Sequence, residues 1–128
     1  MKEELKELLE NSYSPYSHFR VSAIVVTTDG KKFKGVNVEN ASYGACICAE
    51  RSALLSCISS GVKKEDIKEL YVMCDNDKIG MPCFECRQVI VELMDPKSHV
   101  VCMNPKGDSL VLTVNDLCPF PFTEEDLK

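Results

Sequence analysis

The sequence predicts an α/β layered domain, with helices on the faces of a mixed five-stranded sheet. Hydrophobic periodicity and turn residues give the element order α-β-β-α-β-α-β-β. Helices that alternate with strands in this way usually pack on a sheet. The 128 residues are the length of a single domain, which we expect to span residues 1–128.

The N-terminal half contains an expected helix and an expected β-hairpin. Leucines recur at i, i+3 and i+4 within residues 2–10, which is typical of an amphipathic helix. A polar loop then leads to residues 21–27, whose apolar and β-branched composition indicates a strand buried on both faces. Asp29–Gly30 predicts a two-residue turn before a second strand over residues 32–38.

The second expected helix covers residues 48–60, and Gly61 is its expected C-terminal cap. Apolar residues surround most of this helix, so we expect burial on two sides, the second against another subunit. The tail cannot form a regular helix at 119–122, and residues 123–125 are expected to cap a last short turn. The remaining expected elements are a strand, a third helix and two strands, at residues 70–74, 82–94, 100–103 and 110–114.

Charge and composition exclude several classes of function. The net charge is −5, and the only compact basic group, residues 31–34, is interpreted as a solvated hairpin face. A polynucleotide-binding protein normally carries a basic stripe, so we expect a small free substrate and no nucleic-acid partner. The N-terminus lacks a secretory apolar region, and no apolar run approaches the roughly 20 residues of a membrane span. The sequence therefore predicts a soluble cytoplasmic protein without a membrane partner.

Two cysteine motifs carry the chemistry. One is Cys48-Ala49-Glu50, and the other is the segment Pro-Cys-Phe-Glu-Cys that contains Cys83 and Cys86. Each begins an expected helix, and together they supply three thiols and a carboxylate. Three thiolates can hold Zn²⁺ and leave a fourth position for water, as catalytic sites do. We therefore expect Cys48, Cys83 and Cys86 to bind Zn²⁺.

Five further cysteines lie outside the two motifs: Cys46, Cys57, Cys74, Cys102 and Cys118. Cys57, Cys74 and Cys102 lie in apolar helix or strand patterns and are expected to be small buried hydrophobic residues. Cys46 lies close to the first motif, but it lacks a glutamate two residues later. We therefore interpret Cys46 as a decoy and not as a metal ligand.

Glu50 is the candidate proton carrier of the site. In a deamination it would take a proton from the zinc-activated water and pass it to a ring nitrogen of the base, and then carry another to the leaving ammonia. Residues two apart on a helix point roughly 200° from each other, so spacing alone does not place Glu50 beside the metal. The alternative is an ordinary first-turn glutamate, which the helix dipole favours. The match to the Cys-x-Glu…Pro-Cys-x-x-Cys signature of zinc nucleobase deaminases favours the catalytic role.

Three thiolates donate much charge to a metal, which makes its bound water harder to ionise. The expected helix N-termini offset part of that charge. Arg51 can offset more of it through donors that bond sulfur, although an ordinary surface ion pair is the alternative role.

The chain resembles the cytidine deaminases, in particular the short homotetrameric type with three cysteine ligands. The resembling segments follow in the expected order over nearly the whole chain, at residues 13–19, 35–43, 48–53, 82–88 and 117–122. The resemblance implies a three-layer α-β-α fold and a Zn²⁺ cofactor. It also implies hydrolytic deamination of cytidine and deoxycytidine to uridine and deoxyuridine plus ammonia, a reaction of pyrimidine salvage.

The same resemblance implies residue roles that spacing does not reveal. Asn37 and Glu39 match a pair that holds the ribose hydroxyls, and residues two apart on a strand do share a face. Phe19 matches an aromatic residue that packs against the pyrimidine ring. Ala49 is expected to offer its backbone to the base. Two residues, Tyr43 and Phe122, match positions that complete the pocket of a neighbouring subunit, so the homotetramer is expected to share its active sites.

The sequence departs from this family at three positions. Phe84 replaces a usual glycine beside the metal ligands, so it could reshape the metal loop or the roof of the pocket. Ser22 replaces a usual glycine, and Cys118 replaces a usual leucine in the tail. None of these changes removes an expected ligand.

Three other readings remain open. A related deaminase could act on another cytosine compound such as blasticidin S, although Asn37 and Glu39 favour a plain ribose. An RNA- or DNA-editing deaminase shares the zinc chemistry but lacks support from the charge. A non-catalytic zinc module would need a fourth protein ligand, such as Cys46, to close the coordination.

Overall fold

The computed structural model describes residues 1–128 and contains a five-stranded mixed sheet between two helical layers. The strand order is β2-β1-β3-β4-β5. Only β3 and β4 are parallel, and helix α3 connects them. The strands are β1 (Val21–Thr27), β2 (Lys32–Val36), β3 (Ile67–Cys74), β4 (His99–Met103) and β5 (Ser109–Thr113). The predicted mixed five-stranded sheet is therefore confirmed.

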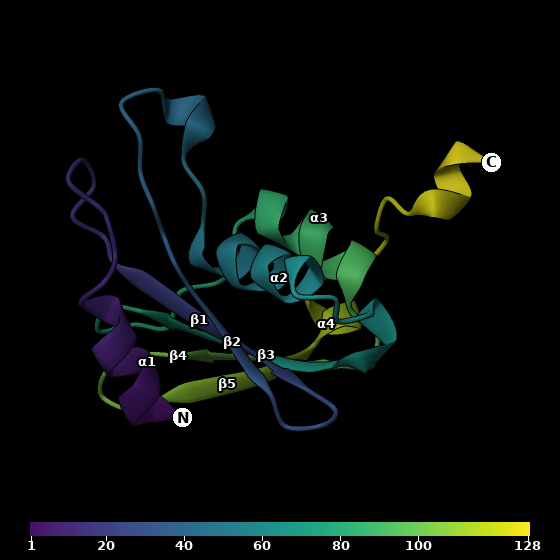
Figure 1. Ribbon diagram of the computed structural model, residues 1–128, viewed down its shortest axis with the longest axis horizontal. Helices are drawn as coiled ribbons and strands as arrows, with labels where there is room; N and C mark the ends of the chain where they lie inside the picture. The colour runs from purple at the N-terminus through teal and green to yellow at the C-terminus, as the bar shows by residue number, and fades with distance from the viewer.

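Two helices cover one face of the sheet and one helix covers the other. Figure 1 shows α2 (Ala49–Ser59) and α3 (Phe84–Leu93) side by side over the sheet. On the opposite face, α1 (Lys2–Leu9) packs Leu5 and Leu9 against Ile24 of β1 and Met73 of β3. None of the helices has the length and apolar character needed to cross a lipid bilayer.

Successive side chains of β1 point to opposite faces of the sheet, so this central strand contributes to the cores on both sides. Its residues are buried almost without interruption, as predicted. Ile24 belongs to the α1 side, whereas its neighbours Ala23 and Val25 belong to the larger core beneath α2 and α3. The predicted buried cysteines, Cys57, Cys74 and Cys102, all lie in that larger core.

Several boundaries differ from the sequence prediction. The connection after β1 comprises residues 28–31, because the backbone N–H of Thr27 still bonds the carbonyl of Lys31 beyond the Asp29–Gly30 turn. Strand β2 ends at Val36, and the chain then continues through two isolated bridges at Val38, one with Tyr13 and one with Ile47. The short helix α4 (Val114–Leu117) was not predicted, whereas Thr123 caps the final 3-10 turn (Glu124–Leu127) as expected.

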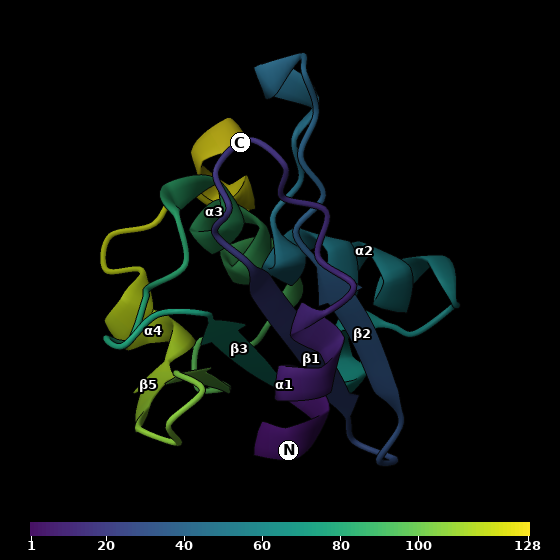
Figure 2. The same ribbon diagram turned by 90° about the vertical axis from the view of Figure 1, so that its left-hand side faces the viewer.

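Residues 37–48 form an arm that leaves the sheet and returns to the start of α2. The backbone of this arm pairs with the loop before β1 through a bridge between Tyr13 and Val38. Figure 2 shows the arm standing beside that loop above the sheet. At its tip, the 3-10 turn Tyr43–Ala45 carries a Tyr43 side chain that is 77% exposed.

A glycine in β2, Gly35, allows the backbone of α2 to pack directly against this strand. A Cβ atom at Gly35 would lie 2.4 Å from the backbone nitrogen of Ala53 and 2.6 Å from the carbonyl oxygen of Ala49. Both contacts are with helix backbone, which cannot rotate away as a side chain does. Gly35 therefore fixes how closely the segment after Cys48 approaches the sheet.

We expect Gly35→Ala to lower the free energy of unfolding by about 2 kcal/mol, because the added methyl group displaces α2. Gly44→Ala is the control, since a Cβ at Gly44 meets nothing within 4 Å. Urea denaturation of both variants checks this, with the control expected within about 0.5 kcal/mol of the parent. Equal stability of the two variants would contradict the close packing at Gly35.

Candidate active site

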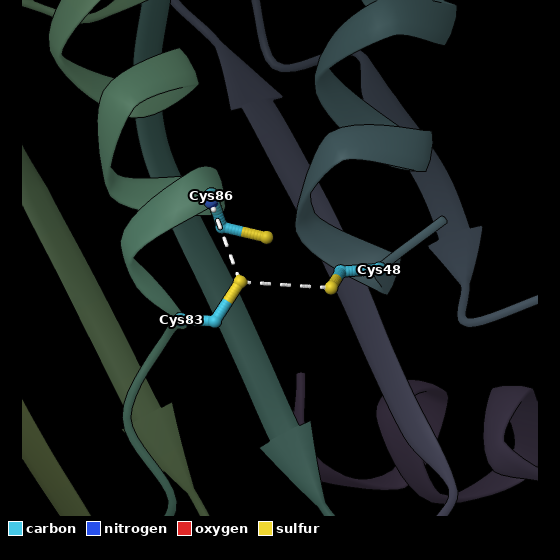
Figure 3. A group of neighbouring side chains, drawn as sticks. All are labelled: Cys48, Cys83 and Cys86. Carbon is cyan, nitrogen blue, oxygen red and sulfur yellow. Dashed lines mark hydrogen bonds between the residues drawn. The ribbon is translucent and has the colours of Figure 1, made fainter. Parts of the chain in front are cut away.

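Three cysteine sulfurs meet where α2 and α3 begin. Cys48 caps α2, Cys83 caps α3, and Cys86 lies in the first turn of α3. Figure 3 shows their side chains pointing toward one another from the two helices. The three Sγ atoms lie within 4.8 Å of one another, and those of Cys48 and Cys83 are 3.8 Å apart. Cys46 lies outside this cluster, where its sulfur accepts a hydrogen bond from the Asn40 amide at 3.2 Å.

The donor set fits Zn²⁺. Tetrahedral zinc with Zn–S bonds of about 2.3 Å places its sulfur ligands about 3.8 Å apart. The Cys48–Cys83 separation equals this value, and the cluster supplies three of the four ligands that zinc takes. Three sulfurs without a fourth protein group are the ligand count of a catalytic site and not of a closed structural one.

The surroundings favour thiolate at Cys48. Hydrogen bonds from Cys86, Arg51 and Cys83 lower its pKa to about 5, although burial opposes the shift. The pKa of Cys86 is raised, first by its interaction with the neighbouring Cys48 sulfur and then by its burial. The N–H of Cys86 also donates to the Cys83 sulfur at 3.5 Å, as expected for a free donor at a helix N-terminus.

Arg51 lies against the sulfur cluster. Its Nη2 donates to the Cys48 sulfur at 3.5 Å, and its Nη1 lies 3.8 Å from a carboxylate oxygen of Glu85. The Cys48 sulfur is the main reason that the pKa of Arg51 is raised above its ordinary value. The Nε atom of Arg51 is buried and has no hydrogen-bond partner in the chain. The guanidinium is therefore held beside the thiolates and not in solvent.

Glu50 is buried beside the same cluster, with only 4% of its surface exposed. Burial is the main reason that the pKa of its carboxyl is raised to about 7, and the charge of Cys48 contributes to the rise. The Cys86 thiol has the opposite, smaller effect. Glu50 therefore lies close enough to the sulfurs to interact with them, which the helical spacing alone left undecided. An acid of this pKa can both accept and release a proton near neutrality.

A cavity of about 250 Å³ extends from Cys48, one of the three candidate metal ligands, to the arm. It brings the candidate sugar residues Asn37 and Glu39 together with Cys48 and Arg51. The rest of its lining is Tyr43, Gly44, Cys46, Ile47 and Glu85. A second cavity of about 250 Å³ shares Glu39, Tyr43 and Cys46 with the first and adds Tyr16 and Ser17. The candidate sugar residues and Cys48 of the sulfur cluster thus line one continuous region.

Six predicted site residues lie outside the lining of this cavity: Cys83, Cys86 and Glu50 at the sulfur cluster, and Phe19, Ala49 and Phe122. Phe19 is 41% exposed and contacts Asn37 only through its carbonyl, which accepts from Nδ2 at 2.8 Å. Ala49 is fully buried at the first helical position of α2, where its N–H is one of the free donors of the helix end. Phe122 is 55% exposed and lines a separate groove between α3 and the tail.

The three departures from the family pattern are accommodated without disturbing the cluster. Phe84 is 78% exposed, and its ring lies against the guanidinium of Arg87, 4.4 Å from the ring centre. It therefore borders the tail groove and does not roof the metal cavity. Ser22 is buried and donates to the carbonyl of Leu5 at 2.9 Å, which fastens α1 to the sheet. Cys118 is also buried, and its thiol contacts the carbonyl of Arg87.

Two residues of this region received no role from the sequence. Glu85 lines the cavity and pairs with Arg51, and its position directly before Cys86 was the only available signal. Ser17 bonds Glu39 across 22 positions of the chain. No local spacing rule connects residues so far apart.

The chain is similar to known proteins over most of its length. The family model described as "Cytidine and deoxycytidylate deaminase zinc-binding region" matches residues 1–103. A cytidine deaminase of Halalkalibacterium halodurans is 42% identical over 92% of this chain and 88% of its own. A probable cytidine deaminase of Dictyostelium discoideum is 44% identical over 91% of this chain and 77% of its own.

Solved structures give the same result. A crystal structure of cytidine deaminase from Burkholderia pseudomallei superposes with a TM-score of 0.90, at 45% identity and 94% coverage of both chains. The cytidine deaminase of Mycobacterium tuberculosis superposes with a TM-score of 0.79, at 29% identity, over 96% of this chain and 94% of its own. These matches confirm the predicted three-layer fold and the Zn²⁺ cofactor, and the chain belongs to the cytidine and deoxycytidylate deaminase family of zinc-binding proteins.

Proposed function

We propose that the protein hydrolyses the exocyclic amine of cytidine and deoxycytidine, releasing ammonia and forming uridine and deoxyuridine. One observation carries the proposal: a buried carboxyl lies beside three converging thiols, at one end of a cavity that reaches Asn37 and Glu39. When bound by Cys48, Cys83 and Cys86, Zn²⁺ supplies the Lewis acidity that lowers the pKa of water.

Glu50 moves the protons in this proposal. Its carboxylate takes a proton from the attacking water, delivers it to the ring nitrogen of cytosine, and carries a second proton to the departing ammonia. Its burial excludes bulk water, and its pKa near 7 keeps both protonation states within reach during one reaction cycle. Each transfer then occurs without a large energetic penalty.

Arg51 has the complementary task of balancing charge. Its Nη2 contact with the Cys48 sulfur draws charge from a thiolate, which leaves the metal site a stronger acid. Glu85, at 3.8 Å, competes weakly for the same guanidinium from an exposed position. The buried, hydrogen-bonded partner has the larger effect on Arg51.

Recognition of the nucleoside falls to residues of the arm and the loop before β1. We assign the sugar hydroxyls to Asn37 and Glu39, which line the cavity within the same arm. We assign the pyrimidine ring to Phe19 and the backbone of Ala49, as the family resemblance implies. The ligand count of three argues against a purely structural zinc module, for which a fourth protein ligand is the rule.

We also propose that the protein is a homotetramer with shared active sites, in which Tyr43 and Phe122 complete the pocket of a neighbouring subunit. Both are largely exposed, and Phe122 faces a groove of its own chain other than the metal cavity. Two apolar side chains of α2, Leu55 and Ile58, are 47% and 39% exposed on the side away from the sheet. A second subunit covering these surfaces would bury them and bring Phe122 to a neighbouring site.

We place the reaction in pyrimidine salvage in the cytoplasm. All eight cysteines are free thiols, with three of them gathered at the metal site. Such a cysteine inventory suits a reducing compartment. The absence of a disulfide also leaves the metal ligands as thiols.

Glu50→Gln is expected to lower kcat for cytidine by about 10²- to 10⁴-fold, because the amide cannot carry a proton. Zinc content and folding are expected to remain at the parental level. Glu3→Gln is the matched control, since Glu3 occupies the first turn of α1 as Glu50 does that of α2. Measuring ammonia release and zinc by atomic absorption checks both variants. Undiminished turnover by Glu50→Gln would refute the assigned role.

The raised pKa of Glu50 also predicts a pH dependence of stability. In the folded chain the carboxyl holds its proton up to a pH of about 7, whereas in the unfolded chain it releases it near 4.5. Stability is therefore lost as pH rises from 4.5 through 7, by about 3 kcal/mol for this group. We expect chelator-treated Glu50→Gln to match its parent near pH 4.5 and to exceed it by this amount at pH 8. Urea titrations at the two pH values measure the difference, and a pH-independent difference would contradict the burial argument.

Phe122→Ala is expected to lower kcat/KM for cytidine at least tenfold if Phe122 completes a neighbouring pocket. Mixed oligomers give the sharper test, because a Phe122→Ala subunit retains Glu50 and a Glu50→Gln subunit retains Phe122. Co-refolding the two impaired variants should give a fraction of the sites both Glu50 and Phe122, and with them parental activity. Leu127→Ala, another exposed apolar residue of the tail, is the control. Mixtures no more active than their parents would count against shared sites.

A further inference from the structure

The two candidate sugar residues are engaged mainly with their own chain. Oδ1 of Asn37 accepts from the hydroxyl of Ser12 and from the backbone N–H of Val21. Its Nδ2 donates to the carbonyl of Phe19 at 2.8 Å. An asparagine amide has two donors and two acceptor sites, so three of its four bonds are taken. One N–H of Asn37 remains for a ligand.

Glu39 is also bonded mainly to its own chain, but it keeps a free acceptor site where Asn37 keeps a free donor. Its Oε1 accepts the backbone N–H groups of Tyr16 and Ser17, each at 3.0 Å. Its Oε2 accepts the hydroxyl of Ser17. A carboxylate has about four acceptor sites, so one site on Oε2 remains. Together the two side chains retain one donor and one acceptor, which matches a pair of vicinal hydroxyl groups.

Ser17 is the residue that holds this arrangement in place. It contributes two of the three bonds to Glu39, through its amide and its hydroxyl. Its Oγ also accepts the N–H of Phe19 at 3.0 Å. Ser17 therefore ties the residue assigned to the sugar to the residue assigned to the base.

Two further observations concern this loop and the Glu39 carboxylate that it binds. His18, between Ser17 and Phe19, has a φ of 59°, in the left-handed region that few non-glycine residues adopt. Such a conformation persists where surrounding bonds impose it. The hydroxyl of Ser17 is also the largest cause of the lowered pKa of Glu39, which keeps that carboxylate ionised.

We propose that Ser17 is a positioning residue for sugar recognition: its amide and hydroxyl fix the Glu39 carboxylate so that its remaining acceptor site meets one ribose hydroxyl. This inference rests on the proposed nucleoside deaminase function. Ser17 touches neither the metal ligands nor Glu50, so its effect falls on binding and not on the chemical step.

Because Ser17 is proposed to act on binding and not on the chemical step, its loss should change KM and not kcat. Loss of the hydroxyl leaves Oε2 free to rotate and to bind water, and the ordering must then be supplied when the substrate binds. Binding weakened equally in the ground and transition states raises KM and leaves kcat nearly unchanged. We expect Ser17→Ala to raise KM for cytidine about tenfold, the size of one hydrogen bond to a charged group.

The experiment compares cytidine with 2′,3′-dideoxycytidine, which lacks both hydroxyls. Parent, Ser17→Ala, Ser17→Gly, Ser17→Thr and Ser14→Ala are each assayed with both substrates. Ser17→Ala and Ser17→Gly are expected to lose most of the preference for cytidine, and Ser17→Thr, which keeps the hydroxyl, is expected to restore it. Ser14 lies in the same loop and makes no hydrogen bond with Glu39. Its hydroxyl only accepts a 3.2 Å bond from Ser12, whose shorter bond goes to Asn37, so Ser14→Ala is expected to behave as the parent. Because Ser17 is exposed, its variants are expected to keep the parental Tm.

Combination with Glu39→Gln separates positioning from a general loop effect. If Ser17 acts through Glu39, the double variant is expected to be no worse than Glu39→Gln alone. Additive losses, equal losses for the two substrates, or a lowered kcat with an unchanged KM would each overturn the inference. Failure of the parent itself to deaminate cytidine would instead overturn the proposed function, and the inference with it.

Discussion

The site depends on the meeting of two helix N-termini above one face of the sheet. Cys48 and Cys83 each cap a helix, and Cys86 follows within the first turn of α3. Unpaired N–H groups and the positive ends of the helix dipoles therefore face the three sulfurs. Without them, a cluster of thiolates would carry an uncompensated charge in a partly buried region. Gly35 contributes to this meeting because it lets α2 approach β2 at backbone contact distance.

The same charge concentration explains the state of Glu50. A carboxyl buried beside a thiolate resists ionisation, and its pKa consequently lies near 7. Arg51 opposes this effect but is held chiefly by Cys48. In a purely structural zinc site such a carboxyl would be an unexplained cost. In a hydrolytic deaminase it is the property that a proton carrier needs.

Much of the fold was predictable because its signals are local. The apolar run 21–27 predicted β1, and Gly61 predicted the end of α2. Both are present, and Gly61 has a positive φ of 91°. The hairpin turn and the end of β2 were less well predicted, because pairing across the sheet decides where a ladder stops. Helix α4 has only four residues, too few for a periodic pattern, although Thr113 and Asp116 form a capping box at its start.

In the site, too, local motifs were predictable and contacts between distant segments were not. Two short motifs predicted which cysteines gather, because each motif begins a helix. The direction of Glu50 could not be derived from helical spacing, and it depends on how α2 and α3 pack. The role of Ser17 was equally inaccessible, because its bonds to Glu39 join a loop and an arm that meet only in the folded chain.

The position of the sugar residues has a consequence for assembly. The hydrogen bonds of Glu39 with Tyr16 and Ser17 lie at the surface of the single chain, where water competes with each of them. Hydrogen bonds become stronger when water is removed from around them. In the proposed tetramer a neighbouring subunit would cover this region, where Tyr43 at the tip of the arm is 77% exposed in the single chain. Assembly would then strengthen the bonds that hold the carboxylate. The proposed tetramer would in this way couple sugar recognition to subunit association through Glu39.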